Sequence, residues 1–271
     1  MLTEDQKHQI EIENQAISNS IGNIRHRILV FSGKGGVGKT TISVNLAFAL
    51  QARGYRTGLL DADVTGPDVP KMLGIKGELH THDRKIVPHI SYDLKVISIA
   101  SLLGPDQPVI WRGPMRSKVL HQFLADVEWG NLDYLIADLP PGTGDEVISL
   151  AQKMSPEIAI IVTTPQEVSL IDSARAINMA RKMKVPEIYV IENMAGLICP
   201  VCGARIELFG SGGGEKQAEQ MNAHFLGRLP IDIKAREMAD AGRPIMLEDV
   251  NSEISVALIE IASKIEKIFN D

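Results

Sequence analysis

The sequence predicts an α/β fold in which a doubly wound, mainly parallel sheet is flanked by helices. Short runs rich in β-branched residues alternate with longer stretches of helical periodicity along most of the chain. The strand-like runs are apolar throughout rather than alternating, as expected when helices cover both faces of a sheet. The 271 residues, 44% of them hydrophobic, suffice for one large domain with a substantial core.

The expected elements follow one another in the order that such a fold requires. Residues 1–26 are polar with scattered isoleucines and predict a helical extension, and residues 27–271 predict one domain. The expected strands are residues 27–32, 57–60, 94–99, 134–137, 158–163, 187–191 and 225–229. The expected helices are residues 40–53, 115–128, 166–183 and 251–270. Functional groups should gather at the carboxyl ends of these strands.

A phosphate-binding loop lies between the first strand and the first helix of the domain. The residues that fit the pattern Gly-x-x-x-x-Gly-Lys-Ser/Thr are Gly33, Lys34, Gly35, Gly36, Val37, Gly38, Lys39 and Thr40, and Thr41 follows. Glycines let several backbone N–H groups point at phosphate oxygens, and the helix adds the positive end of its dipole. Lys39 would reach the β- and γ-phosphates, and the Thr40 hydroxyl would ligate Mg²⁺. The loop predicts an ATPase that binds ATP or ADP.

Lys34 is a second lysine in this loop, and the generic pattern does not require it. It is either a solvated surface residue or a charge that crosses a dimer interface to the partner's nucleotide, as an arginine finger does. The residue alone does not decide between the two.

Three aspartates follow strands that should open toward the loop. Asp138 is the natural carboxylate to hold Mg²⁺ through water, and Asp61 would share that role. Asp63 is placed to orient an attacking water. Helix caps and turns are the ordinary alternative for such residues. Residues 138–145 then form an expected switch segment, in which Gly142 would donate its backbone N–H to the γ-phosphate.

The two cysteines, Cys199 and Cys202, form one Cys-x-x-Cys pair in a loop. A structural zinc and a [4Fe–4S] cluster each need four ligands, and one chain offers two thiolates. A symmetric dimer with this loop on its two-fold axis would supply the other two. A bridged cluster, a structural zinc and a redox disulfide all stay open at this point.

Composition argues against several other classes of protein. The net charge of −6 is unsuited to sequence-independent binding of nucleic acid. No apolar run approaches the roughly 20 residues needed to span a membrane, and no secretory signal is visible, so a cytoplasmic protein is expected. The three histidines at positions 80, 82 and 89 are expected in a solvated loop, and residues 212–214 in a glycine-rich linker or hinge. Residues 111–115 are expected on a dimer face.

Taken together, the motifs resemble those of the Mrp/ApbC-type iron–sulfur cluster carriers, within the MinD/ParA and nitrogenase-iron-protein group of P-loop ATPases. The matching stretches are the two-lysine loop and residues 61–67, 111–115, 133–145, 163–166, 192–194 and 227–232, with the cysteine pair.

This resemblance implies roles for particular residues. Lys34 would reach across a homodimer, Asn193 would read the adenine edge, and the segment around Pro230 would pack on the base. Cys199 and Cys202 would ligate a [4Fe–4S] cluster shared by two subunits and passed on to apo iron–sulfur proteins. The alternatives are a positioning ATPase of the MinD/ParA kind with a structural zinc at the dimer interface, and a small-molecule P-loop enzyme.

Overall fold

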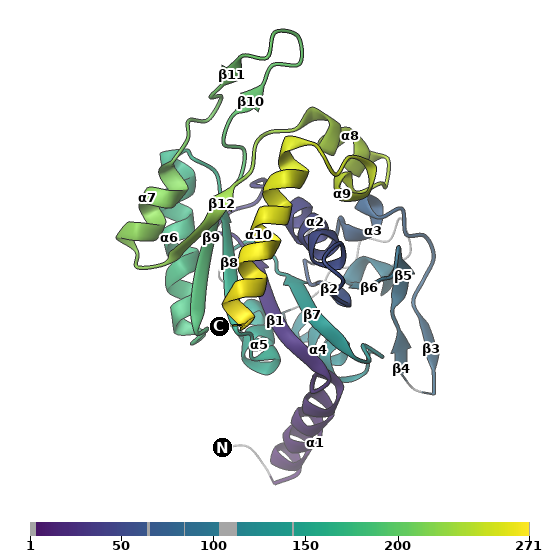
Figure 1. Ribbon diagram of the computed structural model, residues 1–271. Coiled ribbons are helices and arrows are strands. Elements are labelled where there is room, and N and C mark those ends of the chain that lie inside the picture. Colours follow the sequence, from purple (N-terminus) through teal and green to yellow (C-terminus); the bar gives the residue numbers. More distant parts are fainter. Residues whose placement is uncertain (1–3, 64–65, 84, 103–112, 143, 271) are drawn as a thin grey trace.

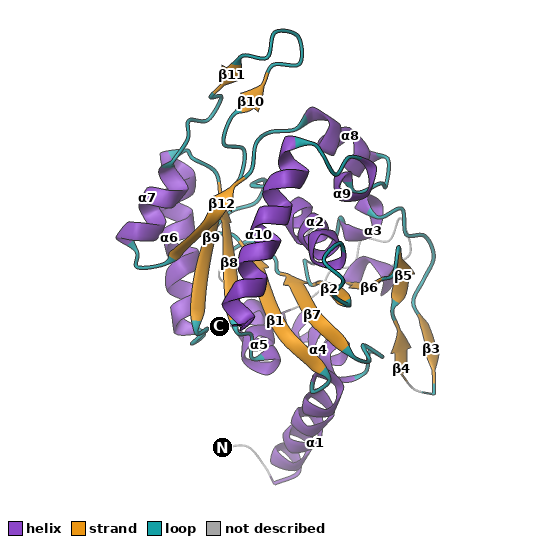
Figure 2. Cartoon of the chain, viewed as in Figure 1, coloured by secondary structure: helices purple, strands orange, loops and turns teal. Residues whose placement is uncertain are grey.

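The computed structural model describes residues 4–63, 66–83, 85–102, 113–142 and 144–270. An eight-stranded sheet runs through the molecule, with helices on both faces (Figures 1 and 2). Its strands, in spatial order, are β12 (His224–Arg228), β9 (Glu187–Glu192), β8 (Ile158–Thr163), β1 (Ile24–Phe31), β7 (Leu132–Asp138), β2 (Thr57–Asp61), β6 (Leu94–Ser98) and β5 (His89–Ser91). Neighbours are parallel except for the antiparallel pair of β5 and β6. The predicted fold class is therefore confirmed.

Two apolar layers hold the helices against the sheet. One layer carries α1 (Glu4–Ile21), α4 (Gly113–Ala125), α5 (Asp145–Met154), α6 (Glu167–Lys182) and α7 (Gly213–Gln220). The other carries α2 (Lys39–Gln51), α3 (Val69–Met72), α8 (Ile233–Asp240), α9 (Ile245–Glu248) and α10 (Glu253–Asn270). Along β1, Leu29 enters the first layer, and Ile28 and Val30 enter the second. Because successive strand residues face opposite sides, a doubly covered strand must be apolar at every position.

Most predicted elements are present with slightly different ends. The largest shift among the strands is at β1, which begins at Ile24 rather than at residue 27. The helix α1 ends just before it, and Ile17 and Ile21 are buried against the body of the protein. None of the helices in the described ranges has the length and apolar character that crossing a membrane requires.

Two small hairpins stand outside the main sheet. The strands β3 (His80–His82) and β4 (Lys85–Val87) pair with each other, so the expected loop around His80 is a strand, although its residues are exposed as expected. The strands β10 (Leu197–Ile198) and β11 (Arg205–Ile206) form a second hairpin, which projects from the body at the top of Figure 1. This second hairpin carries both cysteines. A short 3-10 helix, η1 (Ile99–Leu102), follows β6.

Candidate nucleotide site and cysteine hairpin

The phosphate-binding loop leaves β1 after Phe31 and enters α2 at Lys39, at the carboxyl edge of the sheet. Gly38 stands immediately before α2 with a positive φ of 84°. A Cβ at this position would overlap the side-chain amide of Asn193. Both the backbone conformation and the close approach therefore require glycine at position 38.

Asp138, the last residue of β7, gathers the polar side chains at the start of α2. Its carboxylate lies 2.8 Å from the Lys39 ammonium and accepts a 2.7 Å hydrogen bond from the Thr40 hydroxyl. The Ser43 hydroxyl donates a third bond of 2.7 Å. The aspartate is fully buried, so these partners compensate its desolvation. A hydroxyl and a carboxylate held together in this way fit the oxygen-ligand preference of Mg²⁺.

The sequence reasoning missed Ser43. The signal was available, because Ser43 follows Lys39 by one helical turn and its hydroxyl also bonds the Lys39 carbonyl.

Asp61 and Asp63 occupy two different positions at the end of β2. Asp61 lies opposite Asp138 in the sheet register and is fully buried. Its carboxyl accepts hydrogen bonds from the Ser98 hydroxyl at 2.7 Å and from the backbone of Asp63. Burial, and then the neighbouring charge of Asp138, raise the pKa of Asp61 to about 8. Burial thus favours the neutral form of Asp61, whereas the side chain of Asp63 lies 3.5 Å from the Lys39 ammonium.

The remaining predicted residues of the loop face different surroundings. Lys34 is half-buried, and within the described ranges no acidic side chain pairs with its ammonium group. Gly33 passes so close to the Asp172 backbone at α6 that a Cβ would overlap it. The backbone N–H of Gly142 donates to the Ser32 carbonyl at 3.0 Å, and Gly142 has a φ of 95°. Of the other predicted positions, Thr143 and residues 111–112 lie outside the described residues.

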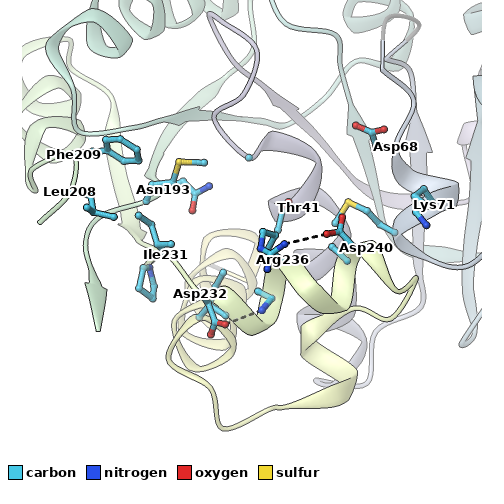
Figure 3. A pocket seen from close by; sticks show the side chains of 17 residues that line it. Thr41, Asp68, Lys71, Asn193, Leu208, Phe209, Ile231, Asp232, Arg236 and Asp240 are labelled. Atoms are coloured by element: carbon cyan, nitrogen blue, oxygen red, sulfur yellow. Dashed lines mark hydrogen bonds and ion pairs between the residues drawn. The ribbon is translucent and has the colours of Figure 1, made fainter. Parts of the chain in front are cut away.

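Two adjoining cavities form one cleft beside the loop. The first, of about 320 Å³, is lined by Asp63, Pro141 and the loop residues from Gly35 to Thr41. The second, of about 640 Å³, is lined by Asn193, Pro230, several apolar side chains and five charged residues, namely Asp68, Lys71, Asp232, Arg236 and Asp240 (Figure 3). Four residues line both cavities: Gly38, Thr41, Asp68 and Met72. The structure thus brings Asn193 and Pro230 to the same cleft as the loop, and Asn193 also donates a 2.8 Å hydrogen bond to the Val37 carbonyl.

The cysteine pair lies apart from this cleft, at the tip of the β10–β11 hairpin. The turn is closed by hydrogen bonds from the Cys199 N–H to the Ala204 carbonyl and from the Gly203 N–H to the Cys199 carbonyl, both 2.9 Å. Cys202 is exposed, Cys199 is half-exposed, and Val201 between them is 92% exposed. Hydrogen bonds from the backbone N–H groups of Cys202 and Val201, and then from the Cys202 thiol, lower the pKa of Cys199. Across the described part of the chain, no three His, Cys, Asp or Glu side chains are grouped to hold a metal ion.

The expected linker at residues 212–214 is the start of a helix instead. Gly213 and Gly214 begin α7, and the carboxylate of Glu192 accepts hydrogen bonds from the N–H groups of Gly212 at 2.8 Å and Gly214 at 2.5 Å. Glu192 ends β9, is fully buried and pairs with Arg228 at 3.3 Å. A carboxylate at a helix N-terminus meets N–H groups that otherwise have no partner. The signal that sequence reasoning missed is an acidic residue at a strand end, the same signal that marked Asp61 and Asp138.

A phosphate-binding loop on a mainly parallel sheet, with aspartates at the neighbouring strand ends, defines a P-loop NTPase. A model of the ParA-type family described as NUBPL iron-transfer P-loop NTPase matches residues 23–266, and the chain belongs to this family. The resemblance inferred from the motifs is thereby confirmed.

Individual relatives agree with this assignment. An iron–sulfur cluster carrier protein of Pyrococcus horikoshii is 49% identical over 253 residues, which cover 89% of this chain and 85% of that protein. A nucleotide-binding protein of Archaeoglobus fulgidus, solved in complex with ADP, is 36% identical with a TM-score of 0.77, covering 89% of this chain and 94% of that one. The cell division ATPase MinD of Pyrococcus furiosus has a TM-score of 0.66 at 21% identity, covering 90% and 100% of the two chains. This last likeness shows the fold alone.

Proposed function

We propose that this protein is an ATP-hydrolysing carrier that holds a [4Fe–4S] cluster between two copies of itself and passes it to apo iron–sulfur proteins. The observation that carries the proposal is the isolation of the two thiols. They lie at the exposed tip of a hairpin, and the chain has no further cysteine to complete a set of four ligands. A second copy would bring the missing pair. Membership in an iron-transfer family supports a cluster as the cargo.

The nucleotide would bind along the cleft, with its phosphates in the smaller cavity and its base in the larger one. Backbone N–H groups of the loop would bind the phosphates, and Lys39 would exchange Asp138 for phosphate oxygens. Thr40 and Asp138 would then hold Mg²⁺, and Asp63 would orient the attacking water. Asn193 and Pro230 would contact the base.

Two features support a response of the dimer and of the switch segment to bound nucleotide. The Lys34 ammonium has no acidic partner among the described residues, which supports a role across the interface at the partner's phosphates. The Gly142 N–H is engaged by the Ser32 carbonyl, so donation to a γ-phosphate would require the switch segment to rearrange. Hydrolysis would then return it to the bonded arrangement seen here.

Exposure of the thiols favours transfer over a purely structural metal. A cluster at the hairpin tip would be accessible to an acceptor protein, whereas a metal with a purely structural role needs no such access. The half-exposed Cys199 already has a lowered pKa, and the thiolate is the form that binds metal.

The test is anaerobic reconstitution of the full chain with iron and sulfide. The parent should bind about four iron and four sulfide ions per two chains, as a shared [4Fe–4S] cluster requires. A Cys199→Ala, Cys202→Ala double variant should lose this iron, whereas a Val201→Ala variant, changed between the two thiols, should keep it. Light scattering should show the cluster-loaded parent as a dimer.

Transfer is measured by mixing the loaded protein with an apo [4Fe–4S] protein and following the acceptor's activity. Equal iron in the double variant and the parent would reject the proposal. A zinc ion that survives aerobic preparation at one per two chains, without any cluster transfer, would support the positioning ATPase instead.

A further inference from the structure

The cysteine hairpin leaves the nucleotide cleft and returns to it. Asn193 and Met194, which precede β10, line the larger cavity. Leu208 and Phe209, which follow β11, line the same cavity. Figure 3 shows Phe209 and Leu208 near Asn193 and Ile231, with Asp68 and Lys71 at the opposite end of the view. Both stems of the hairpin are therefore part of the wall that would surround the base.

The two strands of the hairpin between these stems are held together by hydrogen bonds. Leu197 pairs with Ile206 and Ile198 with Arg205, and the Arg205 guanidinium donates to the Ala195 carbonyl at 3.1 Å. Leu197 also forms a bridge with Ile231, which lines the cavity. Because these bonds tie β10 and β11 together, a movement of the returning stem must move the turn that carries the cysteines.

Each stem is anchored where it joins the body of the protein, at Met194 before β10 and at the start of α7. Met194 has a left-handed backbone, with a φ of 59°, a conformation that persists in a residue other than glycine only where its surroundings hold it. On the returning side, the Glu192 carboxylate binds the N–H groups of Gly212 and Gly214. Phe209 thus lies on a short segment between a fixed helix start and the hairpin.

Phe209 lies at the end of the larger cavity that Leu208 and Ile231 also line. Its side chain is 37% exposed and Leu208 is 55% exposed, although both line a cavity of about 640 Å³. The cavity adjoins the phosphate-binding loop, so a nucleotide held there would bring its base to this wall. Aromatic side chains stack on bases of any identity, because every base has a π-face.

We propose that Phe209 packs on the nucleotide base and that base occupancy thereby fixes the position of the cysteine hairpin. Phe209 is a positioning residue for the thiols, and Leu208 is its neighbour in the same wall. This inference rests on the proposed nucleotide site. It goes further by assigning to the base the coupling between bound nucleotide and the cysteine hairpin. The alternative is coupling through the phosphates, by way of the phosphate-binding loop and the hydrogen bond from Asn193 to the Val37 carbonyl.

The experiment measures the rate at which an aromatic disulfide reagent modifies Cys199 and Cys202 in the cluster-free full chain. Saturating MgADP should change this rate in the parent by about fivefold, at the lower end of couplings between distinct sites. Tripolyphosphate with Mg²⁺, which fills the loop but has no base, should leave the rate unchanged. In Phe209→Ala the rate should no longer respond to MgADP at saturation, although that variant should bind fluorescent ADP about tenfold more weakly.

Two further variants control for a general effect on the hairpin. Phe209→Tyr retains the ring and should retain the response to MgADP. Ile206→Ala truncates an exposed hairpin residue that does not line the cavity, and it should behave as the parent.

An equal response of the parent to tripolyphosphate, or a Phe209→Ala variant that still responds to MgADP, would overturn the inference alone. A parent that fails to bind fluorescent ADP would overturn the proposed nucleotide site, and this inference with it.

Discussion

The phosphate-binding loop and the cysteine hairpin are held in place in opposite ways. Around the loop, Asp138 is fully buried and binds three side chains of α2, and the N–H of Gly142 is also engaged. At the hairpin, all residues from 200 to 209 are exposed, and the two strands contribute two residue pairs. The conformation of the phosphate-binding loop is determined by packing against the sheet, whereas that of the hairpin is determined by its own turn.

The two regions differ because their ligands have different requirements. Phosphate and Mg²⁺ chemistry needs donors and charges that are already oriented, because most of the catalysis is positioning. A cluster that must be handed on needs accessible ligands. In nucleotide-free protein, changes in the buried site should therefore abolish hydrolysis without altering the reactivity of the thiols. Changes confined to the turn that carries the cysteines should alter the thiols without altering hydrolysis.

The largest expected effect comes from Asp138→Asn. Replacing the carboxylate removes the charge that organises Lys39 and the anionic oxygen offered to Mg²⁺, so the ATPase kcat should fall by roughly a hundredfold or more. The measurement is phosphate release at saturating MgATP. Alkylation of the two cysteines in nucleotide-free protein should keep the parental rate.

A matched control lies on the same strand. Asp133 is near the start of β7, where it pairs with the exposed Arg56 at 3.1 Å, away from the cleft. Asp133→Asn should leave kcat unchanged. If it lowered kcat as much as Asp138→Asn, or if Asp138→Asn altered the thiols, the separation of the two regions would be wrong.

The sequence predicted the buried region far better than the exposed one. Short runs made mostly of apolar residues predicted β1, β2, β7, β8 and β9, because strands covered on both faces are apolar over most of their length. The loop and its aspartates followed from their spacing. The short strands β3, β10 and β11 are set by pairings that local composition does not show.

Glu192 and Phe209 illustrate the limit of that prediction. The glycines at 212–214 read locally as a linker, and only the buried carboxylate of Glu192, twenty positions earlier, makes them a helix start. Phe209 is unremarkable in the sequence. A role for it can be inferred only from the structure, in which Phe209 lines the same cavity as Asn193.

A smaller effect, on stability, should follow from Glu192→Gln. The substitution removes the charge that accepts from Gly212 and Gly214 and pairs with Arg228, so it should lower the free energy of unfolding by about 2 kcal/mol. Denaturation in urea measures the change. Gly214→Ala should act in the same direction, because its Cβ would lie 3.0 Å from the Cβ of Glu192.

The control for this stability effect is a glutamate of the exposed region. Glu207 lies beside β11 and is exposed, so Glu207→Gln should change the free energy of unfolding by less than about 0.5 kcal/mol. If the two substitutions lowered the free energy of unfolding equally, the contrast between the buried Glu192 and the exposed hairpin would be wrong.

The smallest effect expected is a pH shift within the hairpin itself. In Cys202→Ser, Cys199 remains as the single thiol, and the backbone N–H groups of residues 201 and 202 still stabilise its thiolate. Its pKa is lowered from the ordinary value of 9.0, so the thiolate forms at lower pH. The rate of alkylation by iodoacetamide should therefore reach half its plateau below pH 9.0 in the folded variant.

The same variant in concentrated urea is the internal control, because unfolding removes the turn and should return the midpoint toward the ordinary value. A folded midpoint at or above the unfolded one would mean that the turn does not orient its N–H groups at sulfur. The hairpin would then be exposed without backbone N–H groups preorganised to stabilise the Cys199 thiolate. A lowered midpoint would instead show that a few local hydrogen bonds prepare a ligand for metal even where burial contributes little.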